Sequence, residues 1–173
     1  ALFDEGDNVG AISSYDQAIK INPNIAFVHS NRGDALRLIG DLEGAIAACT
    51  SAIHIDPKDA SAYLNLGAAL ATAKDFSGAA MVFQQAIQLE PNSGLAHANL
   101  GNCQLESGDL ERAIVTLERA SELDPRDPFA LHNLGTVLAA GTSPARAAAA
   151  FKKAISLPES RYVPKAKLHR SLA

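Results

Sequence analysis

Residues 62–91 read AYLNLGAALATAKDFSGAAMVFQQAIQLEP, and the pattern in this stretch recurs along most of the chain. Its last residue is one of four prolines that stand 34 residues apart: Pro23, Pro57, Pro91 and Pro125. A fixed period of this length indicates a repeat architecture. With the proline set at position 32, the full repeats are residues 26–59, 60–93, 94–127 and 128–161, after a partial repeat at 1–25.

Four further positions of the repeat follow the same period. Position 8 is glycine (Gly33, Gly67, Gly101 and Gly135), and positions 20 and 27 are alanine from Ala11 and Ala18 onward. Position 24 is larger and mostly apolar: Tyr15, Cys49, Phe83, Leu117 and Phe151. Small residues let two helices cross closely, and the large residue fills the space between them.

The turns are also encoded. A glycine or polar residue followed by aspartate lies near positions 15 and 16, where the aspartate can cap the helix that follows. The proline at position 32 ends a helix because it lacks an N–H group. The pattern therefore predicts a first helix, helix A, near residues 26–39, 60–73, 94–107 and 128–140. A second helix, helix B, is predicted near residues 8–21, 42–55, 76–89, 110–123 and 144–157.

These residues resemble the tetratricopeptide repeat (TPR) family, and the resemblance covers the single array 1–173. It implies an all-α, right-handed superhelical solenoid of antiparallel helix hairpins, with the A helices lining a concave groove. We expect Ala79 and Gly101 to be fully buried where helices cross.

Both ends depart from the pattern. Ala1 falls at position 10, so most of a first helix A is expected to be lacking. The repeat 128–161 is divergent, with the turn Gly141-Thr142-Ser143-Pro144 and its last proline one position early. Residues 162–173 are expected to form a C-terminal capping helix or the helix A of another repeat.

In the TPR resemblance the groove is lined by positions 2, 5, 6, 9, 12 and 13 of helix A. Position 6 is asparagine in each full repeat: Asn31, Asn65, Asn99 and Asn133. An amide offers both a donor and an acceptor, so a column of asparagines can hold a peptide backbone. This feature is similar to the asparagine ladder of O-linked N-acetylglucosamine transferase, although the column also fits a structural default of the family. Asn102, Arg37 and His132 complete the predicted groove site.

One familiar partner class is disfavoured. TPR proteins that bind the acidic C-terminal peptide of heat-shock chaperones use a clamp of lysines and arginines at positions 2, 5 and 6, because two carboxylates need several cationic donors. Here position 5 is Ser30, Leu64, Ala98 and His132, and position 6 is always asparagine.

Composition and motifs do not favour an enzyme. The net charge of −4 and pI near 5.7 argue against nucleic acid as a partner, and no apolar run is long enough to insert in a membrane. No histidine or cysteine pair has metal-ligand spacing, and no phosphate-binding or nucleophile motif is present. We therefore expect no metal, no cofactor and no catalytic residues. Two isolated cysteines favour an intracellular, cytoplasmic location.

The sequence thus predicts a protein–protein interaction scaffold that binds an extended peptide or protein segment in its groove. Two alternatives stay open. The chain can self-associate or dock through the solenoid ends, using Ile12, Tyr15 and Ile19 on one face of helix 8–21 and the basic residues 161–173. It can also be the substrate-recruiting part of a larger enzyme.

Overall fold

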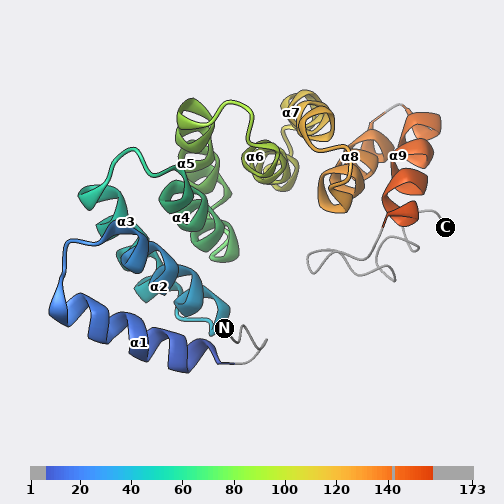
Figure 1. Ribbon diagram of the computed structural model, residues 1–173. Helices are drawn as coiled ribbons and strands as arrows, with labels where there is room; N and C mark the ends of the chain where they lie inside the picture. The colour runs from blue at the N-terminus through green and yellow to red at the C-terminus, as the bar shows by residue number, and fades with distance from the viewer. Residues whose placement is uncertain (1–6, 142, 158–173) are drawn as a thin grey trace. The chain divides into compact units, whose positions relative to one another are not determined.

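The computed structural model describes residues 7–141 and 143–157, and within these ranges the regular secondary structure is all α-helix (Figure 1). The nine helices described are α1 (Asn8–Ile21), α2 (Ala26–Leu38), α3 (Leu42–Ile55), α4 (Ala60–Thr72), α5 (Phe76–Leu89), α6 (Gly94–Glu106), α7 (Leu110–Leu123), α8 (Pro128–Ala140) and α9 (Pro144–Ser156). Each predicted helix is present, with its ends within one residue of expectation. The predicted capping helix at 162–173 lies outside the described residues.

The predicted aspartate caps are confirmed. Asp7, Asp41, Asp75 and Asp109 each accept a hydrogen bond from a backbone N–H in the first turn of the B helix that follows. The preceding turn requires a left-handed backbone, with a φ angle of 87° at Gly40 and 80° at Gly108. Glycine takes this conformation without the steric cost that a Cβ atom imposes.

The helices pair as hairpins: α2 with α3, α4 with α5, α6 with α7, and α8 with α9. Glycine at position 8 makes the close approach possible. A Cβ atom on Gly67 would lie 2.5 Å from the Phe83 ring, and one on Gly101 would lie 2.5 Å from Leu117 Cγ. Ala79 has no exposed surface and Gly101 is buried, so the predicted core contacts are confirmed.

Contacts group the chain into two compact units, unit 1 (residues 1–90) and unit 2 (residues 91–173). In unit 1, α2 also contacts α4, so two A helices are neighbours. In unit 2, α6 and α8 have the same relationship. Each unit therefore has a surface built from two adjacent A helices, which we call its A-helix face.

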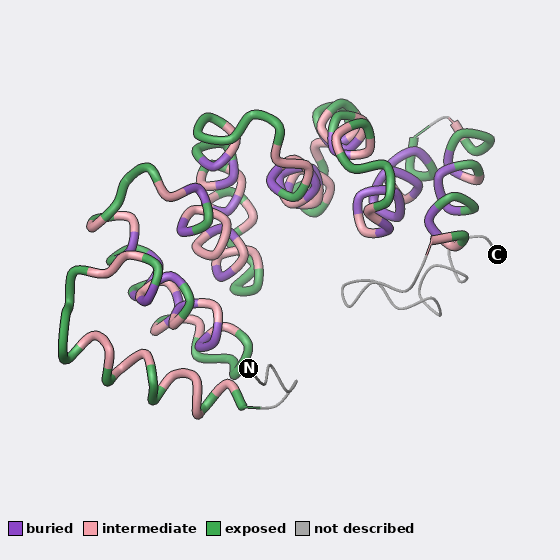
Figure 2. The backbone as a smooth tube through the Cα atoms, viewed as in Figure 1, coloured by how far each residue is buried: buried purple, intermediate pink, exposed green. Residues whose placement is uncertain are grey.

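Helix α1 differs from the other B helices. Figure 2 shows no buried segment on it, and none of its residues is fully buried. Its Ala11, Tyr15 and Ala18 are half-buried, whereas Ala45, Cys49 and Ala52 at the same positions of α3 have no exposed surface. The same side of the helix is therefore fully covered on α3 and only partly covered on α1.

Candidate functional site

The A-helix face of unit 1 carries an exposed stripe on α2. Phe27, Asn31 and Leu38 lie at i, i+4 and i+11, which places them on one side of the helix. The exposed fractions are 62% for Phe27 and 54% for Leu38, and Asn31 is also exposed. Large apolar side chains exposed on the same side of a helix as an amide are available for contact with a partner.

The charged pair on this face is internally neutralised. Arg37 donates from Nη2 and Nε to Asp34 Oδ1, at 2.7 and 3.1 Å. Both side chains are partly exposed, so the pair adds little to stability. Its main effect here is to orient the guanidinium that the sequence predicted for the groove.

The second asparagine of unit 1 is already engaged within the protein. Asn65 on α4 donates from Nδ2 to the Ser30 hydroxyl at 3.0 Å and to the Ser30 carbonyl at 3.4 Å. Ser30 is only 2% exposed, and Asn65 is half-buried. The bond therefore connects the A helices of two successive repeats in a largely buried environment.

Unit 2 repeats this arrangement with a different partner. Asn133 on α8 is 6% exposed and donates from Nδ2 to Asn102 Oδ1 on α6, at 3.1 Å. Asn99, on the same helix as Asn102, is half-buried and has no side-chain hydrogen bond to any residue that the structure describes. The adjacent Leu95 is 50% exposed.

His132 does not project into solvent as a groove residue would. It is 7% exposed, and its ring lies 5.7 Å from the Phe151 ring at a tilted angle. This contact between α8 and α9 assigns His132 to the packing of the last hairpin described.

Three hydrogen-bonded side-chain pairs thus include predicted site residues: Asn65 with Ser30, Asn133 with Asn102, and Arg37 with Asp34. Asn31 and Asn99 make no side-chain hydrogen bond within the part of the chain that the structure describes. Sequence reasoning did not find the contribution of Ser30. Its position next to Asn31, on the same helix, was the available signal.

Position 4 of helix A has a separate structural task. His29 Nε2 lies 2.7 Å from the Pro23 carbonyl, and His97 Nε2 lies 3.1 Å from the Pro91 carbonyl. Tyr63 donates its hydroxyl to the equivalent carbonyl of Pro57. A carbonyl only accepts, so both histidines donate from Nε2 and fix the junction between repeats.

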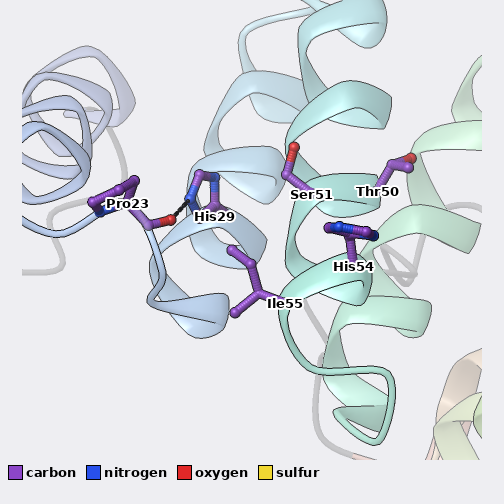
Figure 3. A pocket seen from close by; sticks show the side chains of 6 residues that line it. All are labelled: Pro23, His29, Thr50, Ser51, His54 and Ile55. Carbon is purple, nitrogen blue, oxygen red and sulfur yellow. Dashed lines mark hydrogen bonds between the residues drawn. The ribbon is translucent and has the colours of Figure 1, made fainter.

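One open pocket of about 450 Å³ lies beside this junction in unit 1. It is lined by Pro23, His29, Thr50, Ser51, His54 and Ile55 (Figure 3). The Thr50 and Ser51 hydroxyls donate to carbonyls of their own helix, and the His29 ring is turned to Pro23. Most polar groups of the pocket are therefore already satisfied.

The two cysteines are buried and free. Burial raises the pKa of the Cys49 thiol to about 12 and that of Cys103 to about 11, with nearby Asp34 and Glu106 acting in the same direction. A protonated, inaccessible thiol is a poor nucleophile and a poor metal ligand.

Among residues 7–141 and 143–157 no three histidine, cysteine or acidic side chains are grouped closely enough to hold a metal ion. The same ranges contain no helix with the length and apolar character needed to cross a membrane.

Comparison with known families agrees with this geometry. Residues 70–140 match a family described as tetratricopeptide repeat, and residues 1–38 and 33–74 match one described as TPR repeat. Residues 1–140 consist of TPRs. A search of curated protein sequences returned no match.

Several solved TPR-like structures are similar to this chain. A crystal structure of MamA has 27% sequence identity and a TM-score of 0.77 over 87% of this chain and 88% of the MamA chain. MamA residues 41-end from Desulfovibrio magneticus RS-1 share 23% identity and a TM-score of 0.78, over 88% of this chain and 86% of that one.

A third similarity shows the fold alone. The structure described as the APC/C hetero-tetramer Cut9-Hcn1 has a TM-score of 0.86 at 19% identity, over 97% of this chain and 33% of the matched chain. The all-α repeat fold is therefore confirmed, and a TPR fold supports a role in protein interaction.

Proposed function

We propose that the chain is a protein-interaction scaffold whose A-helix faces bind an extended peptide or protein segment, in the manner of an asparagine-ladder groove. The observation that carries this proposal is the exposed stripe on α2. Phe27 and Leu38 are separated by ~16 Å at 1.5 Å per residue, and the amide of Asn31 lies between them. Such a surface offers two apolar contacts and one bidentate backbone contact.

The remaining features support a neutral or weakly polar segment as the occupant. Asp34 and Arg37 compensate each other, and the clamp positions Ser30, Leu64 and Ala98 carry no charge. A chaperone peptide ending in two carboxylates would lack cationic partners there. Nucleic acid is disfavoured by the net charge of −4. The free thiols fit a cytoplasmic location.

Peptide display tests the proposal. Random dodecapeptides are selected on phage against the full chain, and the affinity of selected peptides is measured by fluorescence anisotropy. The double variant Phe27→Ser/Leu38→Ser should lose about tenfold in affinity, because two apolar contacts disappear. Both side chains are exposed, so folding should be unaffected.

Met81→Ser is the matched control, because Met81 is 64% exposed but lies on the B helix α5. Its affinity for the same peptides should equal that of the wild type. If the double variant binds as tightly as the control, the A-helix face is not the binding surface.

A second candidate function is assembly through the end of the array, and the partly covered face of α1 favours it. Ile12, Tyr15 and Ile19, which share one side of α1, are only half-buried. Light scattering across a concentration series should then show self-association that Ile19→Lys weakens. A monomer at every concentration would remove this candidate.

A further inference from the structure

We infer that the position-6 asparagines have two different tasks. Asn31 and Asn99 recognise the backbone of the bound segment with both ends of their amides. Asn65 and Asn133 instead hold neighbouring A helices together, with their amide nitrogens bonded within the protein. This inference rests on the proposed function for its ligand, and on hydrogen bonds within the protein for the division of tasks.

The first hydrogen bond between neighbouring A helices is in unit 1. The Asn65 amide nitrogen has two acceptors on one residue, the Ser30 hydroxyl and the Ser30 carbonyl. Because Ser30 is nearly inaccessible, solvent competes poorly for these acceptors. The amide is therefore oriented with its nitrogen toward α2, so its Oδ1 is the atom left over.

The second hydrogen bond between neighbouring A helices is in unit 2. Asn133 has even less exposed surface, and its nitrogen is bonded to Asn102 Oδ1 on α6. Removing either partner would leave a polar atom without a hydrogen bond in a dry setting, which costs more than the bond itself contributes. Asn102 keeps its own NH₂ group, because its oxygen is the one that accepts.

The other two asparagines contrast with these. Neither Asn31 nor Asn99 makes a side-chain hydrogen bond within the described part of the chain. Each is more accessible than the asparagine that follows it in the same unit: Asn31 is exposed where Asn65 is half-buried, and Asn99 is half-buried where Asn133 is buried. Their donors and acceptors are both available.

The ligand chemistry follows from this division. A segment on α2 or α6 meets a full amide and must present a free N–H and a free C=O together, as an extended peptide backbone does. On α4 it meets only the Asn65 oxygen, so a backbone N–H is required there, whereas the NH₂ group of Asn102 requires a carbonyl. An unmethylated, extended polypeptide satisfies all of these contacts, independently of its side chains.

The experiment has a ligand-free arm and a peptide arm. In the first, NMR follows exchange of the side-chain NH₂ protons in the uniformly ¹⁵N-labelled full chain. The Asn65 and Asn133 protons should exchange more slowly than those of Asn31 and Asn99. Ser30→Ala should accelerate exchange at Asn65 and leave exchange at Asn133 unchanged. Equal exchange at all four amides would overturn the division of tasks.

In the peptide arm, the display-selected dodecapeptide is the probe. Asn31→Ala should weaken its binding about fivefold, while the urea midpoint stays unchanged or rises slightly because alanine has the higher helix propensity. Asn65→Ala should lower the urea midpoint. N-methylation of the one backbone nitrogen of the probe that bonds to Asn31 should cause a similar loss of affinity for the wild-type chain. The same methyl group should have no further effect on binding to the Asn31→Ala variant.

The outcomes separate the inference from the proposed function. If no peptide binds the A-helix face, the proposed function and the recognition role of Asn31 and Asn99 both fail. The exchange rates still test whether Asn65 and Asn133 hold neighbouring A helices together. If peptides bind there but Asn31→Ala leaves their affinity unchanged, the function stands and the recognition role fails.

Discussion

The side-chain amide of Asn65 on α4 donates to the hydroxyl of Ser30 on α2, 3.0 Å away and 35 residues earlier in the chain. The bond connects helix A of one repeat to helix A of the preceding repeat. An asparagine expected at the groove surface is therefore also part of the contact between repeats.

Replacing Ser30 by alanine should lower the free energy of unfolding by ~1 kcal/mol, because the Asn65 amide loses a buried acceptor. Urea denaturation monitored by circular dichroism measures the change. Ser13→Ala is the control, since Ser13 is exposed on α1 and alanine has the higher helix propensity. The control should be neutral or slightly stabilising, so equal losses at the two sites would contradict this account.

Replacing Gly67 by alanine should cost ~1–3 kcal/mol, because the added methyl group would overlap the buried Phe83 ring. Thermal unfolding measures the loss. The double variant Gly67→Ala/Phe83→Leu tests the cause, since a smaller residue at position 24 makes room for the methyl group. Its cost should be less than the sum of the two single costs, and strict additivity would place the strain elsewhere.

Lys74 occupies the turn position that is glycine in the hairpins before and after it, and its φ angle is 64°. A Cβ atom is unfavourable in this left-handed conformation. Lys74→Gly should therefore stabilise the chain by up to ~1 kcal/mol. Gly108→Lys, the reverse change at the equivalent turn, should destabilise it by a similar amount. Chemical denaturation of both variants tests the pair, and the same sign for both would refute the explanation.

Cys49 should make stability fall at high pH. Its pKa is raised from 9.0 to about 12 in the fold, so between these values the unfolded thiol loses its proton while the folded thiol keeps it. The unfolded state then binds fewer protons, and the free energy of unfolding decreases by up to ~1.4 kcal/mol per pH unit from this group. Cys49→Ala should reduce that slope. An unchanged slope would mean that other groups control the loss.

Asp127 caps α8 through the Phe129 N–H, and burial raises the pKa of its carboxyl group. A raised pKa means that the charged form is less favourable in the folded state than in the unfolded one. The penalty is absent below the unfolded value and present above the folded value. Asp127→Asn keeps a capping oxygen without the charge. It should be more stable than the wild type at pH 7, and the advantage should disappear on acidification.

The control for this change is Asp59→Asn, which exchanges the capping group at the same position of α4. Thermal unfolding of both variants from neutral to acidic pH separates the effect of charge burial from the effect of the cap itself. A gain at Asp127 that is independent of pH would contradict the role of charge burial.

The sequence by itself determined the hairpins. A 34-residue period, glycine at position 8, alanine at positions 20 and 27, and aspartate caps are local or nearly local signals. Each acts within one helix, one turn or one helix crossing. Helix ends could be predicted within one residue because capping, left-handed turns and proline stops depend on neighbours along the chain.

Only the tertiary structure decided how the candidate site is organised. The period placed Asn31, Asn65, Asn99 and Asn133 at one equivalent position, yet their accessibilities and hydrogen bonds differ. In unit 1, the Asn65 amide donates to the hydroxyl of Ser30, which is at position 5 of the preceding repeat. In unit 2, the Asn133 amide donates instead to Asn102, at position 9 of the preceding repeat. A repeat period specifies which residues are equivalent in backbone position. Side-chain bonds depend on the unequal residues that face each other between repeats, and these become visible only when the helices are packed.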